Sequence, residues 1–283
     1  MKVSIIVPFY RGNRYLKRLF TSIENVAVAT RELAQYEVIL VNDSPDCKVS
    51  VPGTWIDVKI VINEKNLGIQ EARINGLRHS LGEWIVFLDQ DDELVDSGFK
   101  RQIELTKEAD IVVGNGTYIL GSVNKQIYKN LNCMKYLIQK EMFIKIRNLI
   151  PSPGECLIRK NVIPKLWTRY LLKNNGADDW FLWLLLFSSG AKFVCNDERV
   201  YIHNDSEGEN LSANLKKMRI SSNEMRTILF KEKMISDKEN KRLKHSIEFK
   251  FLQDTGNLTI KRLLKYKDAL IDNAVYKIKI SFY

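Results

Sequence analysis

The sequence predicts an α/β fold in which a mostly parallel sheet is covered by helices on both faces. Apolar runs rich in β-branched residues alternate with segments whose apolar residues recur at helical spacing, and the connections are short. This alternation is typical of parallel strands joined by crossover helices. Polar residues also follow several expected strands directly, at the sheet edge where ligands bind in such folds.

Residues 1–115 account for most of the expected sheet. Pro8 ends the apolar run VSIIVPFY, and NRYLKRLFTSI has helical periodicity with Tyr15, Leu16, Leu19, Phe20 and Ile23 on one face. Gly68 opens a second helix, which Leu81-Gly82 closes. The expected strands are 3–10, 36–43, 57–63, 84–89 and 109–115, and the expected helices are 13–29 and 67–82.

The remaining sequence is less regular. We expect a helix entered at Asp178 and Asp179 and stopped by Gly190, because acidic residues favour helix starts and glycine favours helix ends. From about residue 211 the pattern is helical and lysine-rich. The other expected elements are a hairpin in 118–130, a helix over 134–149, a turn with a short strand in 152–160, and two short strands at 191–196 and 199–205.

The predicted domains follow this change of pattern and of charge. Residues 1–206 are expected to form one domain with two parts, residues 1–115 and residues 116–206. Residues 207–283 are expected to be a basic helical region, with 17 Lys and Arg against 10 Asp and Glu, which is +7 of the chain's net +10. A basic region of this kind binds an anionic membrane surface or nucleic acid, or is simply a set of solvated helix faces.

The cysteines, the histidines and the lengths of the apolar runs indicate where in the cell the protein is expected to be. The four cysteines form no CxxC pair and only three histidines are present, so we expect reduced thiols and no structural zinc. The N-terminal apolar run is too short for a signal peptide, and the longest apolar run, residues 180–187, is too short to span a bilayer. We therefore expect a cytoplasmic protein, with the inner face of the membrane as a further location.

An acidic cluster follows the strand WIVFL. Asp89, Asp91 and Asp92 lie within four residues, so their repulsion must be offset by positive charge if they are buried. One interpretation of the cluster is a turn or the start of a helix, where aspartate is favoured. On the ligand edge of a sheet, hard carboxylate oxygens suit Mn²⁺ or Mg²⁺, which keep open positions for phosphate oxygens. A phosphatase with a DxD motif would carry it on its first strand, whereas here it follows the fourth.

Other nucleotide enzymes fit less well. The segment NLGIQEARINGL (66–77) has neither the GxGxxG spacing of dinucleotide-binding folds nor the GxxxxGK[ST] spacing of P-loops. The loop PFYRGNRYL has one glycine, whereas a sugar nucleotidyltransferase would need a glycine-rich, basic loop after its first strand. A nucleotide-sugar-binding scaffold without turnover remains an alternative that only a turnover assay distinguishes.

Five segments together resemble the family-2 glycosyltransferases of GT-A fold. They are VSIIVPFYRGNRYLKRLFTSI, VILVNDSPD, NEKNLGIQEARINGL, GEWIVFLDQDDEL and GADDWFLWLLLFSSGAKFVCNDERVYIH, which occur in the family's order over residues 2–205. The resemblance implies a GT-A fold and an inverting, metal-dependent transfer from a nucleotide sugar, with a UDP-sugar as the expected donor. It also implies that residues 1–206 are the catalytic domain, with a nucleotide-binding half (1–115) and an acceptor-binding half (116–206). It leaves open the donor sugar and the acceptor, which is expected to be a glycan or a lipid-linked or protein-linked glycan in bacterial surface polysaccharide or glycoconjugate synthesis.

The resemblance also implies roles for individual residues on the donor side. The loop after the first strand packs on the nucleotide base, Asp43 accepts a hydrogen bond from the base, and Arg73 lies near the base and diphosphate. Asp91 binds Mn²⁺ or Mg²⁺, with Asp89 near the ribose and the metal and His203 approaching them; Asp92 is a supporting or capping residue. The full donor-binding set is Pro8, Phe9, Tyr10, Asp43, Asn66, Gly68, Arg73, Asp89 and Gln90.

On the acceptor side, the family places its general base in an acidic pair at the start of a late helix. This sequence has Asp178-Asp179 in place of Glu-Asp, so the resemblance assigns the base to Asp179 and acceptor binding to Gly154, Asp178 and Trp180. The interpretation of Asp178 and Asp179 that involves no catalysis is capping of the helix. No nucleic-acid partner is expected, since no RNA- or DNA-binding pattern accompanies the basic charge; peripheral membrane contact and oligomerisation through residues 207–283 are both open.

Overall fold

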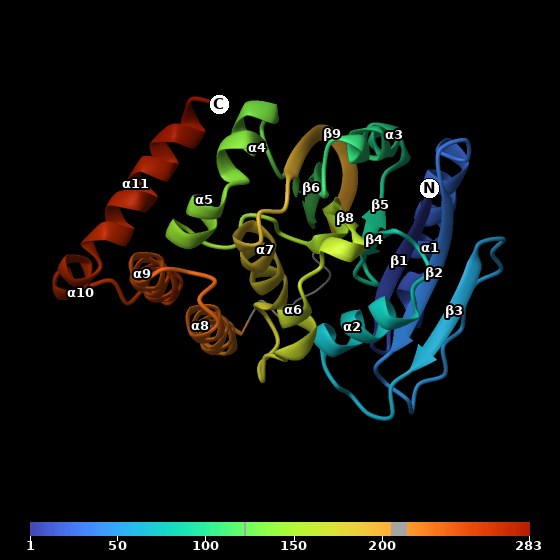
Figure 1. The fold of residues 1–283 in the computed structure, drawn as a ribbon, viewed down its shortest axis with the longest axis horizontal. Coiled ribbons are helices and arrows are strands. Elements are labelled where there is room, and N and C mark those ends of the chain that lie inside the picture. The colour runs from blue at the N-terminus through green and yellow to red at the C-terminus, as the bar shows by residue number, and fades with distance from the viewer. Residues whose placement is uncertain (122, 205–213) are drawn as a thin grey trace. The chain divides into compact units, whose positions relative to one another are not determined.

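The computed structural model describes residues 1–121, 123–204 and 214–283 (Figure 1). The chain divides into two compact units, each drawn from three separate stretches. Unit 1 comprises Met1–Tyr128, Ser152–Ile163 and Lys192–Gly208, and unit 2 comprises Lys129–Pro151, Pro164–Ala191 and Glu209–Tyr283. The predicted acceptor-binding half, residues 116–206, therefore contributes to both units, and its functional role stays a prediction.

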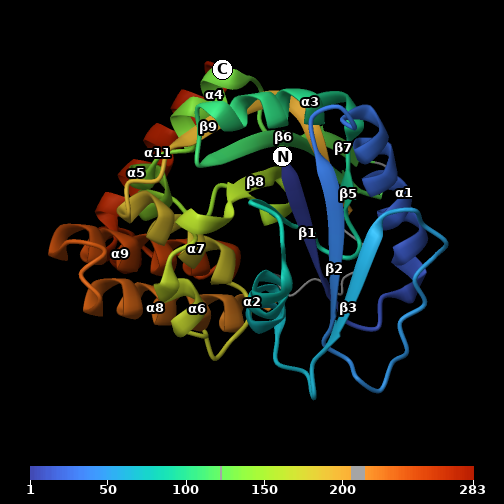
Figure 2. The same cartoon turned by 45° about the vertical axis from the view of Figure 1, so that its right-hand side comes forward.

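All the strands in the described residues lie in unit 1 and form one nine-stranded sheet (Figures 1 and 2). The strand order is β3-β2-β1-β4-β8-β6-β9-β5, and β7 pairs with β6. The strands are β1 (Lys2–Phe9), β2 (Gln35–Asn42), β3 (Asp57–Ile62), β4 (Trp84–Phe87), β5 (Glu93–Leu94), β6 (Ile111–Leu120), β7 (Val123–Gln126), β8 (Cys156–Arg159) and β9 (Phe193–Asn204).

The sheet is mixed. Strands β3, β2, β1 and β4 are parallel, as the sequence predicts for its first half. β8 then inserts antiparallel between β4 and β6, and β5 pairs antiparallel with β9. The parallel strands bring the ends of β1, β2 and β4 to one edge, where the predicted donor residues follow them.

The last strand differs from the prediction. Two short strands, 191–196 and 199–205, were expected on either side of Asp197 and Glu198. The structure instead has a single strand, β9, that pairs with β6 through register shifts beside Asn115. The Asn115 side chain is fully buried and bonds to the backbone of Tyr128 and Gly116, which satisfies polar groups where the ladder is irregular.

Helices cover both faces of the sheet in unit 1. Leu16, Leu19 and Phe20 of α1 join a core with alternate residues of β1, including Ile5. On the other face, α2 comes so close to Ile6 that a Cβ at Gly76 would lie 2.3 Å from its side chain. The helices of this unit are α1 (Asn13–Ala29), α2 (Ile69–His79), α3 (Asp96–Glu104) and the short 3₁₀ helices Leu105–Lys107, Pro153–Glu155 and Lys160–Val162.

Unit 2 is helical in its described residues and is built around α7. Seven consecutive residues of this helix, Trp180–Leu186, are buried, so α7 is the central core helix of the unit rather than an amphipathic surface helix. Its helices are α4 (Leu131–Leu137), α5 (Lys140–Lys145), α6 (Lys165–Arg169), α7 (Asp178–Ser188), α8 (Leu215–Lys231), α9 (Asp237–Asp254), α10 (Ile260–Lys265) and α11 (Lys267–Ser281).

One expected helix of unit 2 is interrupted. The sequence predicts a continuous helix over 134–149, whereas α4 ends at Leu137 and α5 begins at Lys140. Ile138 and Gln139 have ψ angles of 67° and 141°, outside the helical range, which breaks the hydrogen-bond ladder between the two helices. The expected entry at Asp178 and the glycine after the helix end, Gly190 with φ of +78°, are confirmed for α7.

Two predictions about the whole chain can be compared with the structure. All four cysteines are free thiols. No helix within the described ranges is long and apolar enough to cross a membrane.

Candidate active site

Asp43, which directly follows β2, organises the loop before α2. Its carboxylate is 5% exposed and accepts hydrogen bonds from the Asn63 side chain (2.8 Å), the Leu67 amide (2.8 Å) and the Gly68 amide (2.9 Å). Asn66 also accepts from the Gly68 amide, at 3.1 Å. Predicted donor residues Asp43, Asn66 and Gly68 therefore form one hydrogen-bonded cluster.

Gly68 is required by its backbone geometry. Its φ of +88° with ψ of 165° is a conformation that side chains with a Cβ rarely adopt. This conformation turns the chain into α2 while the Gly68 amide faces the Asp43 carboxylate. The glycine thus sets where α2 begins, and thereby the position of Arg73 on that helix.

The loop after β1 is joined to the loop after β4. The Tyr10 amide donates to the Gln90 side-chain oxygen at 2.9 Å, and the Gln90 side-chain nitrogen donates to the Tyr10 carbonyl at 3.1 Å. The Tyr10 side chain is 49% exposed and Pro8 is half-buried, whereas Phe9 is fully buried in the core. Of the three residues predicted to pack on the nucleotide base, Tyr10 follows β1, whereas Pro8 and Phe9 are the last residues of that strand. The prediction is wrong for the Phe9 side chain, because it belongs to the core.

Arg73 and Asp89 form a shielded ion pair at the same edge. The guanidinium donates to the Asp89 carboxylate at 2.6 Å, and the Arg73 side chain is only 4% exposed against 26% for Asp89. The pair offsets part of the repulsion within the acidic cluster, as the sequence requires. Arg73 thereby places a permanent positive charge next to Asp89.

Asp92 points inward rather than to the ligand edge. Its side chain is 1% exposed and accepts from the Tyr201 hydroxyl and from the Asn204 amide (2.9 Å), and it lies 3.3 Å from His203 Nδ1. Burial raises the pKa of Asp92 to about 6, although the adjacent His203 opposes the rise. Burial disfavours the charged form of His203, but the hydrogen bond and charge of Asp92 raise its pKa overall. Asp92 thus holds the imidazole through Nδ1, in the way that carboxylates orient metal-binding histidines.

The protein groups proposed for the metal suit the ion only in part. Asp89 and Asp91 supply the hard oxygens that Mn²⁺ and Mg²⁺ prefer, and the Asp92 contact with Nδ1 leaves Nε2 as the imidazole nitrogen for a metal. Across the described ranges, however, no three His, Cys, Asp or Glu side chains converge closely enough to hold a metal ion. A cation at Asp89 and Asp91 would therefore have to take most of its ligands from a bound diphosphate.

In unit 2, Asp179 lies in the first turn of α7. Its carboxylate accepts from the Asn148 side chain at 2.8 Å and from the Trp180 amide at 2.7 Å. Asp178 is 4% exposed, and its carbonyl accepts from the Trp167 indole at 2.8 Å. The Trp180 indole N–H is buried and has no hydrogen-bond partner in the part of the chain that the structure describes.

Gly154, in unit 1, is packed too closely for a side chain. A Cβ there would lie 2.7 Å from the Tyr201 ring and 3.2 Å from Leu88. The neighbouring Glu155 is fully buried, and its second carboxylate oxygen, Oε2, has no hydrogen-bond partner among the described residues. The glycine therefore has a packing role whether or not it also contacts an acceptor.

Several residues of this site were not predicted as site residues from the sequence. Tyr201 is two residues before His203 on β9, so strand alternation places both side chains on one face, and this spacing was the available clue. The Asn204 side chain donates to the Asp91 carbonyl and to the Glu93 carboxylate, and the Asn63 side chain donates to Asp43. Arg18 donates to the Asp91 carbonyl and lies 3.2 Å from Glu93, a contact between residues more than 70 positions apart.

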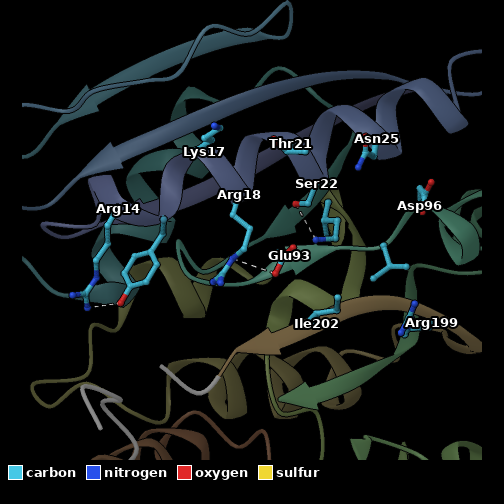
Figure 3. A pocket seen from close by; sticks show the side chains of 13 residues that line it. Arg14, Lys17, Arg18, Thr21, Ser22, Asn25, Glu93, Asp96, Arg199 and Ile202 are labelled. Atoms are coloured by element: carbon cyan, nitrogen blue, oxygen red, sulfur yellow. Dashed lines mark hydrogen bonds and ion pairs between the residues drawn. The ribbon is translucent and has the colours of Figure 1, made fainter. Parts of the chain in front are cut away.

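A separate hollow of about 660 Å³ lies between α1 and the segment that contains β5 (Figure 3). Its lining combines basic side chains such as Arg14, Lys17 and Arg199 with Glu93 and Asp96. None of the predicted donor, acceptor or metal residues lines it. This hollow therefore does not mark the predicted donor site, which the hydrogen-bonded strand ends indicate more directly.

The family model described as "Glycosyl transferase family 2" matches residues 4–167, more than half of the chain. The chain belongs to the family-2 glycosyltransferases. The matched range contains the Asp43 cluster, Arg73 and the acidic cluster, and it ends before Asp179.

Individual relatives differ in how much they share with this glycosyltransferase-family chain. The cholesterol galactosyltransferase of Borreliella burgdorferi is 24% identical over 298 residues, which cover 98% of this chain and 79% of that protein. Other bacterial and archaeal relatives are 27–29% identical, and the chain spans only 22%, 47% and 56% of their lengths.

Solved structures confirm the predicted GT-A fold. Residues 1–349 of Staphylococcus aureus TarS, in complex with UDP-GlcNAc, superpose with a TM-score of 0.66 at 16% identity, covering 95% of this chain and 80% of that one. The mannosyltransferase PcManGT from Pyrobaculum calidifontis, in complex with GDP-Man and Mn²⁺, gives a TM-score of 0.54 at 14% identity and covers 98% and 75%. At these identities the likeness concerns the fold alone.

Proposed function

We propose that this family-2 glycosyltransferase transfers a sugar from a UDP-sugar to a hydroxyl group of a glycan or lipid-linked acceptor, with inversion at the anomeric carbon. The observation that carries the proposal is the hydrogen-bonded edge formed by Asp43, Tyr10–Gln90 and Arg73–Asp89. In a member of this family, these contacts join the loops expected to receive the base and the diphosphate. TarS, which shares the fold, is known in complex with UDP-GlcNAc.

On the donor side, Tyr10 and Pro8 pack against the base, and Asp43 accepts a hydrogen bond from it while maintaining its loop. Arg73 offsets charge that grows on the leaving diphosphate, an electrostatic contribution of several kcal/mol in comparable sites. Asp91, Asp89 and His203 would hold Mn²⁺ or Mg²⁺. When bound, the cation adds further positive charge at the diphosphate.

On the acceptor side, Asp179 removes the proton from the attacking hydroxyl as the bond to the anomeric carbon forms and the bond to the diphosphate breaks. One displacement from the opposite face inverts the anomeric configuration. The Asn148 amide orients the Asp179 carboxylate, and the buried Trp180 indole N–H is a donor that an acceptor oxygen would satisfy.

The acceptor is proposed only as a class. A lipid-linked glycan agrees with the peripheral membrane contact predicted for residues 207–283 and with a location at the inner face of the membrane. The relative from Borreliella burgdorferi that matches nearly the whole chain is named for transfer to a lipid, cholesterol. Bacterial surface polysaccharide or glycoconjugate synthesis remains the proposed context.

The proposal is tested first on the donor. Melting temperatures measured with UDP, dTDP, GDP and CDP, each with Mn²⁺ or with EDTA, should rise for UDP with metal, because a ligand that binds the native state stabilises it. Release of UDP from a panel of UDP-sugars then tests turnover. Binding without any release of UDP, with acceptor mixtures present, would favour the scaffold alternative; a shift with GDP alone would overturn the choice of base.

A further inference from the structure

We propose that α10 and α11 form a surface that binds anionic lipid bilayers. These two helices, red in Figure 1, lie within unit 2 and carry an exposed apolar stripe between exposed cations. The apolar side chains, with their exposed fractions, are Ile260 (79%), Leu264 (70%), Leu270 (39%), Ile271 (58%), Val275 (45%), Ile278 (58%) and Phe282 (84%).

The stripe follows helical spacing. On α11, Ile271, Val275, Ile278 and Phe282 are separated by four, three and four residues, so their side chains line one face of the helix. An apolar stripe that faces water is unfavourable, because removing each apolar side chain from water lowers the free energy of the system. Ala269 and Asp272, which lie outside this stripe, are the buried residues of α11.

The acidic and basic side chains of this region differ in their exposure and in their contacts. Residues 260–283 contain six Lys and Arg and two Asp. Both aspartates turn toward α9: Asp272 lies 2.6 Å from the Arg242 guanidinium, and Asp268 lies 2.8 Å from His245 Nδ1. The six cations are all exposed: Lys261, Arg262, Lys265, Lys267, Lys277 and Lys279.

The exposed cations beside the apolar stripe indicate the kind of partner that this surface binds. An apolar stripe with only cations beside it complements a surface that is apolar below and anionic above, which is the headgroup region of an anionic bilayer. The cations remain in the headgroup layer while the apolar side chains enter the acyl boundary. α11 is about 22 Å long at the usual rise per residue, so it lies along the surface rather than across the membrane.

Vesicle co-sedimentation of the full chain tests the proposal and needs no glycosyl transfer, so its outcome is independent of the proposed reaction. Phosphatidylcholine vesicles containing phosphatidylglycerol should bind the protein, and vesicles of phosphatidylcholine alone should bind it far less. High salt should weaken the binding to the anionic vesicles, because exposed charges are screened.

Matched variants separate this surface from general charge and hydrophobicity. Lys261→Gln/Lys267→Gln/Lys277→Gln should weaken binding about a hundredfold, at the usual contribution of each basic residue near an anionic membrane. The control with the same charge change, Lys59→Gln/Lys107→Gln/Lys125→Gln in unit 1, should change it less than about fivefold.

The apolar stripe is tested in the same way. Ile271→Ser/Ile278→Ser should weaken vesicle binding about tenfold or more. Ile60→Ser/Ile62→Ser on β3, where the side chains are 44% and 63% exposed, should leave binding unchanged. All four side chains are exposed, so unchanged melting temperatures will show that the variants are folded.

Two results would overturn the proposal. Equal binding of both triple-lysine variants would show that net charge, not this surface, attracts the vesicles. Alternatively, light scattering could show a dimer that Ile271→Ser/Ile278→Ser converts to a monomer while vesicles bind neither form. The stripe would then be covered by a second copy of the chain.

Discussion

Replacing Asp43 with alanine should destabilise unit 1 even without a nucleotide. The substitution removes the acceptor for three donors, the Asn63 side chain and the Leu67 and Gly68 amides, at 2.8 to 2.9 Å. Hydrogen bonds to a charged group contribute about 1.5–3 kcal/mol each. Leu67 is 44% exposed, so water can replace part of the loss there, and we expect a decrease of about 3–5 kcal/mol in unfolding free energy.

Urea unfolding of Asp43→Ala and the wild type, without ligand, measures this difference, and the melting temperature should fall by about 10 °C. Amide hydrogen exchange gives a local readout, since the Leu67 and Gly68 amides should exchange faster. The control is Asp46→Ala, three residues away, which removes an exposed ion pair with Arg11 and should change stability by less than about 1 kcal/mol. If both variants lost equally little stability, the argument that Asp43 organises this loop would be refuted.

Three further predictions concern single residues. Arg73→Lys should weaken UDP binding about tenfold in calorimetry, because lysine cannot reproduce the planar guanidinium contact with Asp89, whereas Arg78→Lys on the exposed side of α2 should not. Asp179→Asn should lower kcat by about 10²–10⁴ while UDP binding stays unchanged, and an unaffected kcat would assign the base elsewhere. Burial raises the pKa of Glu155 well above 4.5, so the native state binds its proton more tightly than the unfolded chain does. The unfolding free energy of the wild type should therefore decrease as pH rises above about 4.5, because the carboxyl then loses its proton more readily in the unfolded chain than in the native state. Urea unfolding at several pH values measures this decrease, and the Glu155→Gln variant should not show it.

The first half of the fold could be predicted from local sequence. The apolar runs that became β1, β2, β3 and β4 are continuous and bounded by polar residues, and parallel strands bring such boundaries to one edge. The polar residues at that edge, including Asp43 and Asp89, could therefore be grouped before any coordinates were known. The resemblance to a family then suggested their roles.

The second half depends on contacts that the local pattern does not encode. The charged middle of β9, Asp197 and Glu198, falls in an irregular part of the ladder, and the strand continues because β6 pairs with it on both sides and β5 pairs with its end. The helix over 134–149 has helical periodicity throughout, but Ile138 and Gln139 leave the helical conformation. The antiparallel insertion of β8 places a strand from the middle of the chain between β4 and β6.

The sequence by itself determined the family, the fold class and the edge of the sheet where the donor residues gather, because these depend on periodicity and on short motifs. Only the tertiary structure decided that Asp92 turns inward to Tyr201, 109 residues away, while Asp89 meets Arg73. Three adjacent carboxylates look equivalent in a sequence. Their environments differ because burial and long-range partners, which arise only when the chain folds, determine which protein groups each carboxylate contacts.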